Sequence, residues 1–166
     1  MRLEGFRIRG IGPFRGEFSV DFADYQDARI IAVTGHNGAG KSTALECALP
    51  GALYRSTPTR GSLTSLATCR DAFVEARVVN GRSWTIRHTV DGVSGKGESV
   101  ILDEDGNPAT ASGKVRDFDA FAASHFPPEN LLLASVFGAQ GSSGFLGMKR
   151  ADRIDVILRA VGADHL

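Results

Sequence analysis

The N-terminal residues alternate between apolar and polar side chains, a pattern that predicts strands with one buried face. Residues 3–9 (LEGFRIR) set Arg7 and Arg9 between apolar positions, and residues 16–22 (GEFSVDF) place three apolar side chains on one face: Phe18, Val20 and Phe22. Gly12-Pro13 lies between the runs and is typical of a turn, because proline fixes φ and glycine tolerates unusual dihedral angles. The sequence therefore predicts two strands joined by a turn.

A different pattern follows at residues 29–34 (RIIAVT), which form a short continuous apolar run. Such a run is expected of a strand that is covered on both faces of a sheet. It leads into Gly35 and a glycine-rich loop, and residues 42–49 (STALECAL) begin a predicted helix. The predicted order is therefore buried strand, glycine-rich loop and helix.

Alternation returns between residues 71 and 90, where the runs FVEARVV and SWTIRHTV are separated by Asn80-Gly81. Asn-Gly between alternating runs is a strong hairpin signal, because both turn positions accept a positive φ. Residues 99–102, followed by the turn pair Asp105-Gly106, predict a third antiparallel strand. We therefore expect antiparallel hairpins over about residues 71–107.

The remaining residues are predicted to be mostly helical. Residues 117–124 predict a helix that Pro127-Pro128 stops, because proline cannot continue a helix. A second glycine cluster spans residues 138–147. Residues 149–161 then space four apolar side chains as a helix does: Ile154, Ile157, Leu158 and Val161.

Composition narrows the class of protein. The 166 residues suit one domain, and 19 basic and 19 acidic side chains cancel, so net charge gives no argument for nucleic-acid or membrane binding. No apolar run approaches the roughly 18 residues of a membrane span, and the N-terminus lacks the features of a signal peptide. Cys47 and Cys69 form neither a metal-ligand spacing nor a disulfide framework. We therefore expect a cytoplasmic protein that makes no membrane contact.

Glycine is unusually frequent, with 20 in 166 residues against about 7% on average, and its first cluster carries a motif. Residues 35–42 (GHNGAGKS) match G-x-x-x-x-G-K-[ST] at every fixed position. The backbone N–H groups of such a loop wrap a phosphate, so side chains must be absent where the chain approaches the anion. A chance match is the alternative, and the apolar run before the loop and the helix after it argue against chance.

The motif assigns a role to each part of the loop. Lys41 is predicted to bridge β- and γ-phosphate oxygens, and the Ser42 hydroxyl to bind Mg²⁺. His36 occupies a free position of the motif, where an exposed side chain without a chemical role is expected. The predicted nucleotide-binding residues of the loop are Gly35, His36, Asn37, Gly38, Ala39, Gly40, Lys41, Ser42 and Thr43.

Motifs beyond the loop resemble one family. The first two strands end in Asp21-Phe22, the helix after the loop ends in Ala52-Leu53-Tyr54, and the hairpin region contains Cys69-Arg70-Asp71 and the run SWTIR at residues 83–87. With the phosphate loop, these motifs resemble the start of the SbcC/Rad-fifty ATPase family, whose members are ABC-type, SMC-like proteins of DNA double-strand-break processing. The resemblance covers essentially the whole chain.

The second glycine cluster resembles the Q-loop of that family. It reads VFGAQG at residues 136–141, followed by Phe145-Leu146. The Gln140 amide oxygen is suited to bind Mg²⁺, and its dipole to hold the attacking water, so Gln140 is predicted to contact both nucleotide and metal. The alternative is a glycine-rich surface loop whose glutamine is only solvated.

The resemblance implies an α/β fold, an ABC-type phosphate-loop NTPase lobe with a mixed sheet around the Walker A strand, loop and helix and an antiparallel β subdomain. Residues 1–166 would be the N-terminal half of an ATPase head, incomplete without its C-terminal half: phosphate loop 35–43, hairpins about 71–107, Q-loop about 138–146 and the start of a coiled-coil helix about 149–166. Three further residues lie where family members approach the nucleotide: Ser65, Leu66 and Ala67.

The implied function is an ATPase that uses ATP and Mg²⁺ to drive conformational change in a nuclease complex. The implied partners are the C-terminal half, a second head, an SbcD-type nuclease and double-stranded DNA. Walker B and the signature loop would lie in the C-terminal half, so this chain has no predicted catalytic residue and should be inactive alone. Residues 100–104 (VILDE) resemble Walker B and residues 94–98 (SGKGE) a signature loop, but both precede Gln140 and leave no room for a helix between them. Residues 103–107, with Asp-Gly at the tip, are instead predicted to be a hairpin turn.

Two departures from the family matter. Gly12-Pro13 replaces a family side chain near the nucleotide, and Pro50-Gly51 makes the first helix one residue longer, so we expect that helix to end or kink there. Two alternatives remain. One is another SMC-like ATPase, RecF-like or from phage defence, and the other is a free-standing phosphate-loop kinase or GTPase, although an Asn-Lys-x-Asp base-reading motif is absent from the sequence.

Overall fold

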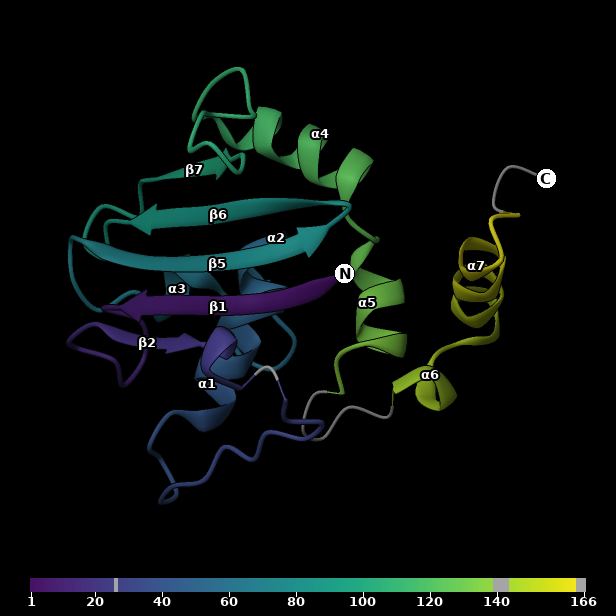
Figure 1. The fold of residues 1–166 in the computed structure, drawn as a ribbon, viewed down its shortest axis with the longest axis horizontal. Coiled ribbons are helices and arrows are strands. Elements are labelled where there is room, and N and C mark those ends of the chain that lie inside the picture. Colours follow the sequence, from purple (N-terminus) through teal and green to yellow (C-terminus); the bar gives the residue numbers. More distant parts are fainter. Residues whose placement is uncertain (26, 139–143, 164–166) are drawn as a thin grey trace. The chain divides into compact units, whose positions relative to one another are not determined.

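A computed structural model describes residues 1–25, 27–138 and 144–163 of the chain. The chain divides into two compact units, Met1–Phe126 and Pro127–Leu166. The first unit contains the sheet, the phosphate loop and the helices that follow the loop (Figure 1). The second unit is helical.

A five-stranded antiparallel sheet forms the first unit, in the order β2-β1-β5-β6-β7 (Figure 1). Because this sheet is combined with helices in the same unit, the predicted α/β class is confirmed. The strands are β1 (Arg2–Arg9), β2 (Phe18–Asp21), β5 (Ala72–Asn80), β6 (Arg82–Val90) and β7 (Gly97–Leu102). The second predicted strand is shorter than expected, because a 3-10 turn, η1 (Phe22–Tyr25), begins at Phe22.

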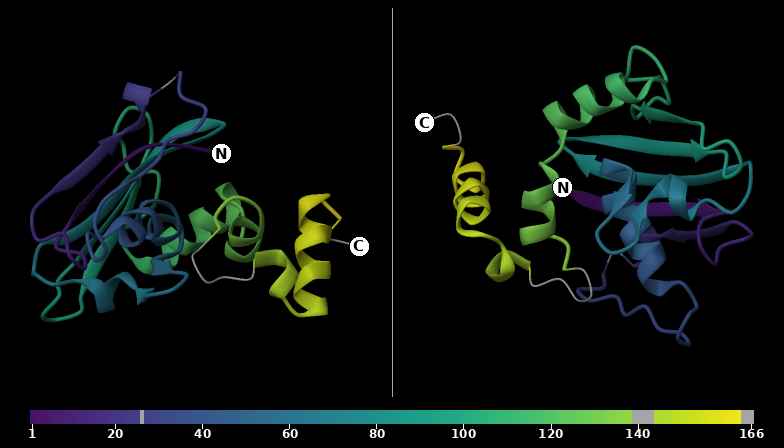
Figure 2. Two further views of the ribbon diagram at one scale, coloured as in Figure 1. Left: turned by 90° about the horizontal axis from the view of Figure 1, so that it is seen from below. Right: turned by 180° about the vertical axis from the view of Figure 1, so that it is seen from behind.

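Helices cover one face of this sheet (Figure 2). The helical stretch after the phosphate loop runs through α1 (Lys41–Glu46), the π-helical segment η2 (Cys47–Gly51) and α2 (Ala52–Tyr54). A small hairpin, β3 (Ser56–Thr57) with β4 (Gly61–Ser62), leads into α3 (Leu63–Leu66). The longer α4 (Val115–His125) packs beside β6 and β7, where the Phe118 ring lies 4.7 Å from the His88 ring.

The core lies between the sheet and these helices, because alternate side chains of each strand point there. The buried strand residues include Phe6, Ile8, Val74, Ala76, Val78, Ile86, His88 and Ile101. The helical stretch contributes Ala44, Cys47, Ala48, Ala52 and Leu53. The period-two pattern in the sequence therefore identifies the buried face of β1, β5 and β6.

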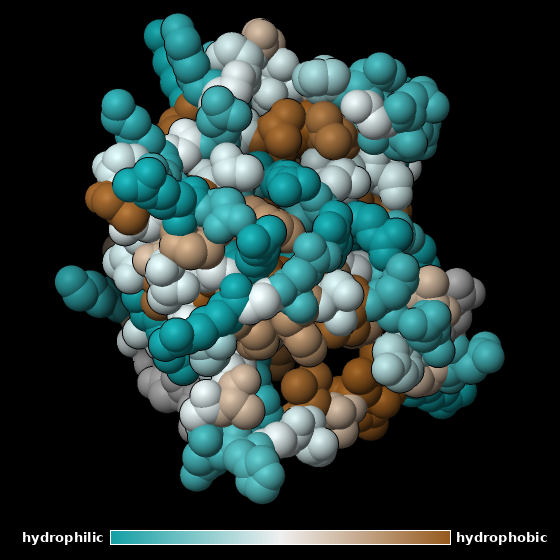
Figure 3. Space-filling view, turned by 90° about the vertical axis from the view of Figure 1, so that its left-hand side faces the viewer, coloured by the Kyte–Doolittle hydropathy of each residue, from teal (hydrophilic) through white to brown (hydrophobic). Residues whose placement is uncertain are grey.

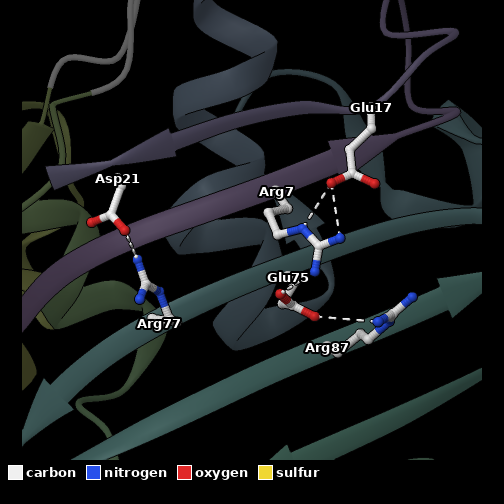
Figure 4. A network of polar contacts seen from close by, with 6 residues as sticks. All are labelled: Arg7, Glu17, Asp21, Glu75, Arg77 and Arg87. Atoms are coloured by element: carbon white, nitrogen blue, oxygen red, sulfur yellow. Dashed lines mark hydrogen bonds and ion pairs between the residues drawn. The ribbon is translucent and has the colours of Figure 1, made fainter.

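The opposite face of the sheet carries ion pairs instead of a covering layer (Figure 4). Arg7 binds Glu17 at 2.8 Å and Glu75 at 3.2 Å, and Arg87 binds Glu75 at 3.3 Å. Arg77 binds Asp21 at 2.6 Å beside them. Because opposite charges pair across neighbouring strands, this face is compatible with water, although each exposed pair adds only about 0–1 kcal/mol to stability.

The predicted hairpin between residues 71 and 90 is confirmed. Asn80 pairs with Arg82, and Gly81 between them has φ 74°. The predicted turn after the third strand is also present, where the Asp103 carboxylate accepts hydrogen bonds from the N–H groups of Asp105 and Asn107. Gly106 has φ 80° there. The Asp103-Glu104 pair thus belongs to a turn, as the sequence predicts.

Pro50 changes the helix without ending it. It lies in η2, whose five residues are all buried and follow α1 without a break. Proline lacks the N–H that an α-helix needs at this position, and a π-helical turn widens the backbone to accommodate one additional residue. The expected disturbance at Pro50-Gly51 is therefore found as a π-helical segment, after which α2 resumes.

The predicted buried strand at residues 29–34 is wrong. These residues form no strand, and their apolar side chains are exposed, with Ile30 at 87% and Val33 at 49% relative exposure. The mixed sheet around this run is therefore not seen, because the described residues offer it no neighbouring strand. A continuous apolar run predicts burial only where a partner covers both of its faces.

The second unit contains α5 (Glu129–Ser135), α6 (Gly144–Gly147) and α7 (Arg150–Ala160). The Asn130 amide donates to Asp155 at 2.8 Å and links α5 to α7. The helix predicted from residue 149 is present as α7, but it ends at Ala160, before a turn in which Gly162 has φ 68°. Ile154, Ile157 and Leu158 on α7 are exposed. None of the helices formed by the described residues has both the length and the apolar character needed to cross a membrane.

Candidate phosphate-binding site

The loop between residues 35 and 40 requires glycine at two positions for different reasons. Gly38 has φ 82° and Gly40 has φ 92°, a left-handed conformation that disfavours side chains. A Cβ on Gly38 would meet nothing within 4 Å, whereas one on Gly40 would lie 2.6 Å from Pro13 Cγ and 2.8 Å from Phe14 Cζ. Gly40 is thus required by packing as well as by its dihedral angles.

Lys41 folds back over the loop. Its Nζ donates hydrogen bonds to the Gly35 carbonyl at 2.7 Å and the His36 carbonyl at 2.8 Å. A positive charge is therefore held at the loop by two fixed acceptors. The loop residues before Gly40 are exposed, His36 included, so an anion has free access to this charge.

The start of α1 adds backbone donors. The Ala44 N–H donates to the Gly40 carbonyl at 2.8 Å. The N–H groups of Lys41, Ser42 and Thr43 precede it and have no acceptor within the helix itself. Ser42 is half-buried at this end, but the Thr43 side chain is only 2% exposed. Thr43 therefore offers an approaching phosphate its N–H and not its hydroxyl.

The β1–β2 turn forms one wall of the loop. A Cβ on Gly12, which has φ 54°, would lie 3.2 Å from Thr43 Cγ2, and Pro13 and Phe14 lie against Gly40. Gly12-Pro13 thus contributes close packing against the start of α1. The Phe14 ring also stacks on Phe18, with ring centroids 5.1 Å apart.

The segment of residues 65–67 lies against the same turn. The Gly12 N–H donates to the Leu66 carbonyl at 2.9 Å, and Ala67 pairs with Ile11 in an isolated bridge. Ser65 is exposed, and its hydroxyl donates to the Ser62 carbonyl at 2.7 Å. Ser65, Leu66 and Ala67 are therefore held beside the turn that walls the phosphate loop.

Cys69 lies beside the same turn and is held by a carboxylate. The hydrogen bond from the Cys69 thiol to Asp71 raises the pKa of the thiol and lowers the pKa of the carboxyl group. Asp71 in turn pairs with Arg9 at 2.7 Å. Cys47, in contrast, is buried in η2, and burial raises its pKa to about 12. Both groups therefore stay thiols at neutral pH.

The predicted Q-loop glutamine, Gln140, lies outside the described residues, as do Ala139 and Gly141. Gly144, Phe145 and Leu146 belong to α6. Within the described ranges, no group of three or more His, Cys, Asp or Glu side chains is placed to hold a metal ion. Of the two predicted Mg²⁺ ligands, Ser42 and Gln140, Ser42 therefore lies within the described residues.

Sequence reasoning missed one residue of this region. Glu46, the last residue of α1, is only 2% exposed, and its carboxylate accepts a hydrogen bond from the Thr59 hydroxyl at 2.7 Å. The signal was present in the helical spacing, because Glu46 lies three residues after Thr43 and next to Cys47, both of which belong to the buried face.

A cavity opens beside the loop, which contributes Ala39 and Lys41 to its lining. It has a volume of about 270 Å³ and lies between the inner side of β1 and β2 and the exposed run of residues 29–34. Its lining is mostly apolar and includes Phe6, Phe18, Phe22, Ile31, Val33 and Leu45. In Figure 3 hydrophobic side chains border an opening toward the lower edge, where Figure 1 places the loop before α1.

The fold and the loop allow a comparison with known proteins. A family profile described as an AAA domain matches residues 6–107, more than half of the chain. The chain belongs to the AAA-domain family. The match spans β1 through β7 and includes the phosphate loop, so the AAA domain of this protein lies within the first unit.

Curated proteins and solved structures add less about the family. No curated protein matches the sequence. Among solved structures, this chain is similar to the SMC head domain from Thermotoga maritima, with 21% sequence identity and a TM-score of 0.48. The similarity covers 73% of this chain and 42% of that chain, so this chain spans less than half of the SMC head.

Proposed function

We propose that this chain binds ATP together with Mg²⁺ through residues 35–43. The geometry of Lys41 and the loop carries the proposal: an ammonium is held at an exposed loop whose two left-handed glycines leave the backbone open, at the start of a helix. Membership of the AAA-domain family supports it. Anion binding is the chemistry that these donors perform together.

The residues present fit the nucleotide. Lys41 would contact phosphate oxygens, and the N–H groups of Gly38, Gly40 and the first helical turn would donate to them. Ser42 would bind Mg²⁺, with Gln140 as the second protein ligand. Mg²⁺ supplies charge neutralisation of the triphosphate, while the chain itself binds and orients the phosphates. The His36 side chain, exposed on the loop, needs no role.

We further propose that the chain is the N-terminal half of an SMC-like ATPase head of the SbcC/Rad-fifty type. The motifs Asp21-Phe22 and Ala52-Leu53-Tyr54 support this assignment. The exposed apolar run of residues 29–34 and the apolar cavity beside it also support the assignment, because a covering strand would bury the run and close the cavity. That strand would come from a C-terminal half, which would also provide Walker B and the signature loop.

The finer role follows from this assignment. ATP would join two heads, and its hydrolysis would drive conformational change in a complex with an SbcD-type nuclease acting on double-stranded DNA. α7 would begin a coiled coil, since Ile154, Ile157 and Leu158 leave an apolar stripe exposed. A RecF-like or phage-defence ATPase is the second candidate, because the same loop and exposed run would serve it equally.

Calorimetry of nucleotide binding tests the proposal. Lys41→Ala should weaken ATP binding by on the order of 1.5–3 kcal/mol, the size of a charge-assisted phosphate contact. Lys96→Ala, in the exposed turn before β7, is the matched control and should bind ATP like the wild type. Unchanged ATP affinity in Lys41→Ala would refute the site, and clear preference for GTP would favour the GTPase alternative.

The proposed half-head makes a separate prediction for turnover. The chain alone should hydrolyse ATP negligibly, and an added C-terminal half should restore activity. Glu104→Gln tests the turn at residues 103–106, because this exposed glutamate should leave any turnover of the reconstituted protein unchanged. Turnover by the chain alone that Glu104→Gln abolishes would mean that residues 100–104 are a Walker B strand after all.

A further inference from the structure

The phosphate-loop helix buries a carboxylate that the proposed phosphate contacts do not use. Glu46 is 2% exposed and is the one buried acidic residue in the described part of the chain. Burying a carboxylate is costly unless hydrogen bonds compensate it. Glu46 lies at the end of α1, five residues after Lys41, and its carboxylate binds Thr59 of the β3–β4 hairpin. Its role must therefore come from what it binds.

Glu46 binds one residue with both oxygens. The Thr59 hydroxyl lies 2.7 Å from Oε1 and 2.9 Å from Oε2, and the Thr59 N–H donates to Oε2 at 3.4 Å. Thr59 lies in the loop of the β3–β4 hairpin. That loop is tightened by Thr57, whose hydroxyl donates to the Gly61 carbonyl and accepts from the Arg60 N–H. Glu46 thus binds the tip of a hairpin that Thr57 also closes.

The hairpin leads directly to the segment beside the site. β4 ends at Ser62, whose side chain caps α3 by accepting from the Ser65 N–H at 3.2 Å. The Leu66 carbonyl then accepts from Gly12, and the Thr68 N–H and hydroxyl both donate to the Gly10 carbonyl, at 2.7 and 3.0 Å. The hairpin is therefore connected to the β1–β2 turn through α3 and the hydrogen bonds of Leu66 and Thr68.

The turn closes a ring by returning to the start of the same helix. Gly12 lies against Thr43, and Pro13 and Phe14 lie against Gly40. The helix of the phosphate loop is thus held at its first residues by the β1–β2 turn and at Glu46 by the hairpin. These two contacts are joined through α3, so the hairpin, the segment of residues 65–67 and the turn form one continuous series of contacts.

We infer that Glu46 is a positioning residue for nucleotide binding, which sets the segment of residues 65–67 and the β1–β2 turn at the rim of the phosphate loop. The inference rests on the proposed binding of ATP. Under this inference the loop and Lys41 hold the phosphates, while the rim elements, which lie outside the loop, contact the part of the nucleotide beyond the phosphates. Glu46 therefore acts on the nucleoside end of the ligand.

The chemistry explains why a carboxylate is used. Both oxygens of Glu46 accept hydrogen bonds from Thr59 donors, and a charged acceptor strengthens them. In Glu46→Gln an amide NH₂ would replace one oxygen and face a donor, so one hydrogen bond would be lost. Thr59→Val removes the hydroxyl from the other side, and Thr59→Ser keeps it.

The test compares ATP with inorganic tripolyphosphate, both with Mg²⁺, by calorimetry on the wild type and the variants. Glu46→Gln and Thr59→Val should each weaken ATP binding about three- to tenfold, the equivalent of one hydrogen bond. Tripolyphosphate binding should stay within about twofold of the wild type, since this ligand reaches only the loop. Thr59→Ser should bind both ligands normally, and Glu46→Gln combined with Thr59→Val should be no weaker than either variant alone. Glu98→Gln, an exposed glutamate of β7, is the charge control.

Three results would overturn the inference. Equal weakening of ATP and tripolyphosphate would show that Glu46 only supports the fold, and unchanged ATP binding in both variants would show that the hairpin does not reach the site. Wild-type protein that binds neither ligand would overturn the proposed function, and the inference with it. If Glu46→Gln fails to fold, as judged by circular dichroism, Thr59→Val and Thr59→Ser still decide between these results.

Discussion

His88 makes the stability of the protein depend on pH in a defined window. Its ring is 2% exposed, its Nε2 lies 2.7 Å from the Ala52 carbonyl and its Nδ1 lies 2.8 Å from the Ser99 hydroxyl. A carbonyl only accepts, so Nε2 carries the proton and Nδ1 accepts from Ser99. His88 is therefore buried as the neutral imidazole, with both nitrogens satisfied.

Burial lowers the pKa of His88 from 6.5 to about 4, and the nearby Arg55 charge acts in the same direction, against the Ala52 carbonyl and Asp119. Between these pH values the unfolded chain binds a proton that the folded protein does not bind. The free energy of unfolding is therefore highest above pH 6.5 and falls as the pH is lowered toward 4. Linkage gives a loss of about 2 kcal/mol between pH 7.5 and 5, and about 3 kcal/mol by pH 4.

Urea unfolding at pH 7.5, 6.5, 5.5 and 5.0 measures this loss. His88→Phe is the comparison, because it keeps an aromatic ring against Phe118 but has no proton to gain. It should be less stable at pH 7.5 by about 1–3 kcal/mol, since the Ala52 carbonyl and Ser99 lose their partner. Its stability should then change less with pH than that of the wild type. Parallel curves for the two proteins between pH 7.5 and 5 would refute the argument, because other titrating groups are common to both.

Three further predictions concern the glycines of the loop, Gln140 and the exposed run of residues 29–34. Gly40→Ala should lower the free energy of unfolding by at least about 2 kcal/mol, because it combines a positive φ with overlap on Pro13 and Phe14. Gly38→Ala should lower it by only about 1 kcal/mol, because no atom lies near the added Cβ. Equal losses in urea unfolding would contradict the packing at Gly40. Gln140→Ala, in protein reconstituted with a C-terminal half, should leave ATP affinity within about tenfold and depress hydrolysis, so wild-type turnover would remove the Q-loop assignment. The exposed apolar run of residues 29–34 should make the protein self-associate as its concentration rises, and Ile30→Ser should reduce that association in light scattering, because Ile30 is 87% exposed. Unchanged association would show that this run is not the contact.

Much of the fold follows from local patterns. Alternation identifies β1, β5 and β6 because each has one buried and one wet face, and Asn80-Gly81 and Asp105-Gly106 mark turns because their glycines adopt positive φ. The phosphate loop is equally local, since its glycines and Lys41 lie within a few residues of one another. Such features depend on neighbours in the sequence, and the sequence contains those neighbours.

Other features depend on residues far apart in the chain. The Glu46–Thr59 pair joins residues 13 positions apart, and the contact of Gly12 with Leu66 joins the first turn to a segment after the helix. The residue type alone predicts exposure for Glu46, because a glutamate in a helix is normally exposed. Only its position on the buried face of α1 indicates that it is buried. The π-helical η2 likewise reflects a packing solution around Pro50 that proline alone does not specify.

The exposed run at residues 29–34 shows where sequence and structure must be combined. Its continuous apolar side chains predict burial on both faces. In the structure Ile30, Ile31 and Val33 are exposed, and an apolar cavity of about 270 Å³ lies beside the run. The pattern in the sequence and the exposure in the structure agree if the run acquires a partner that the described residues do not contain. Paired by a covering strand, the run would bury its side chains, fill the cavity and fix the chain that enters the phosphate loop. Nucleotide binding and the addition of that strand would then stabilise each other, because both order the same loop.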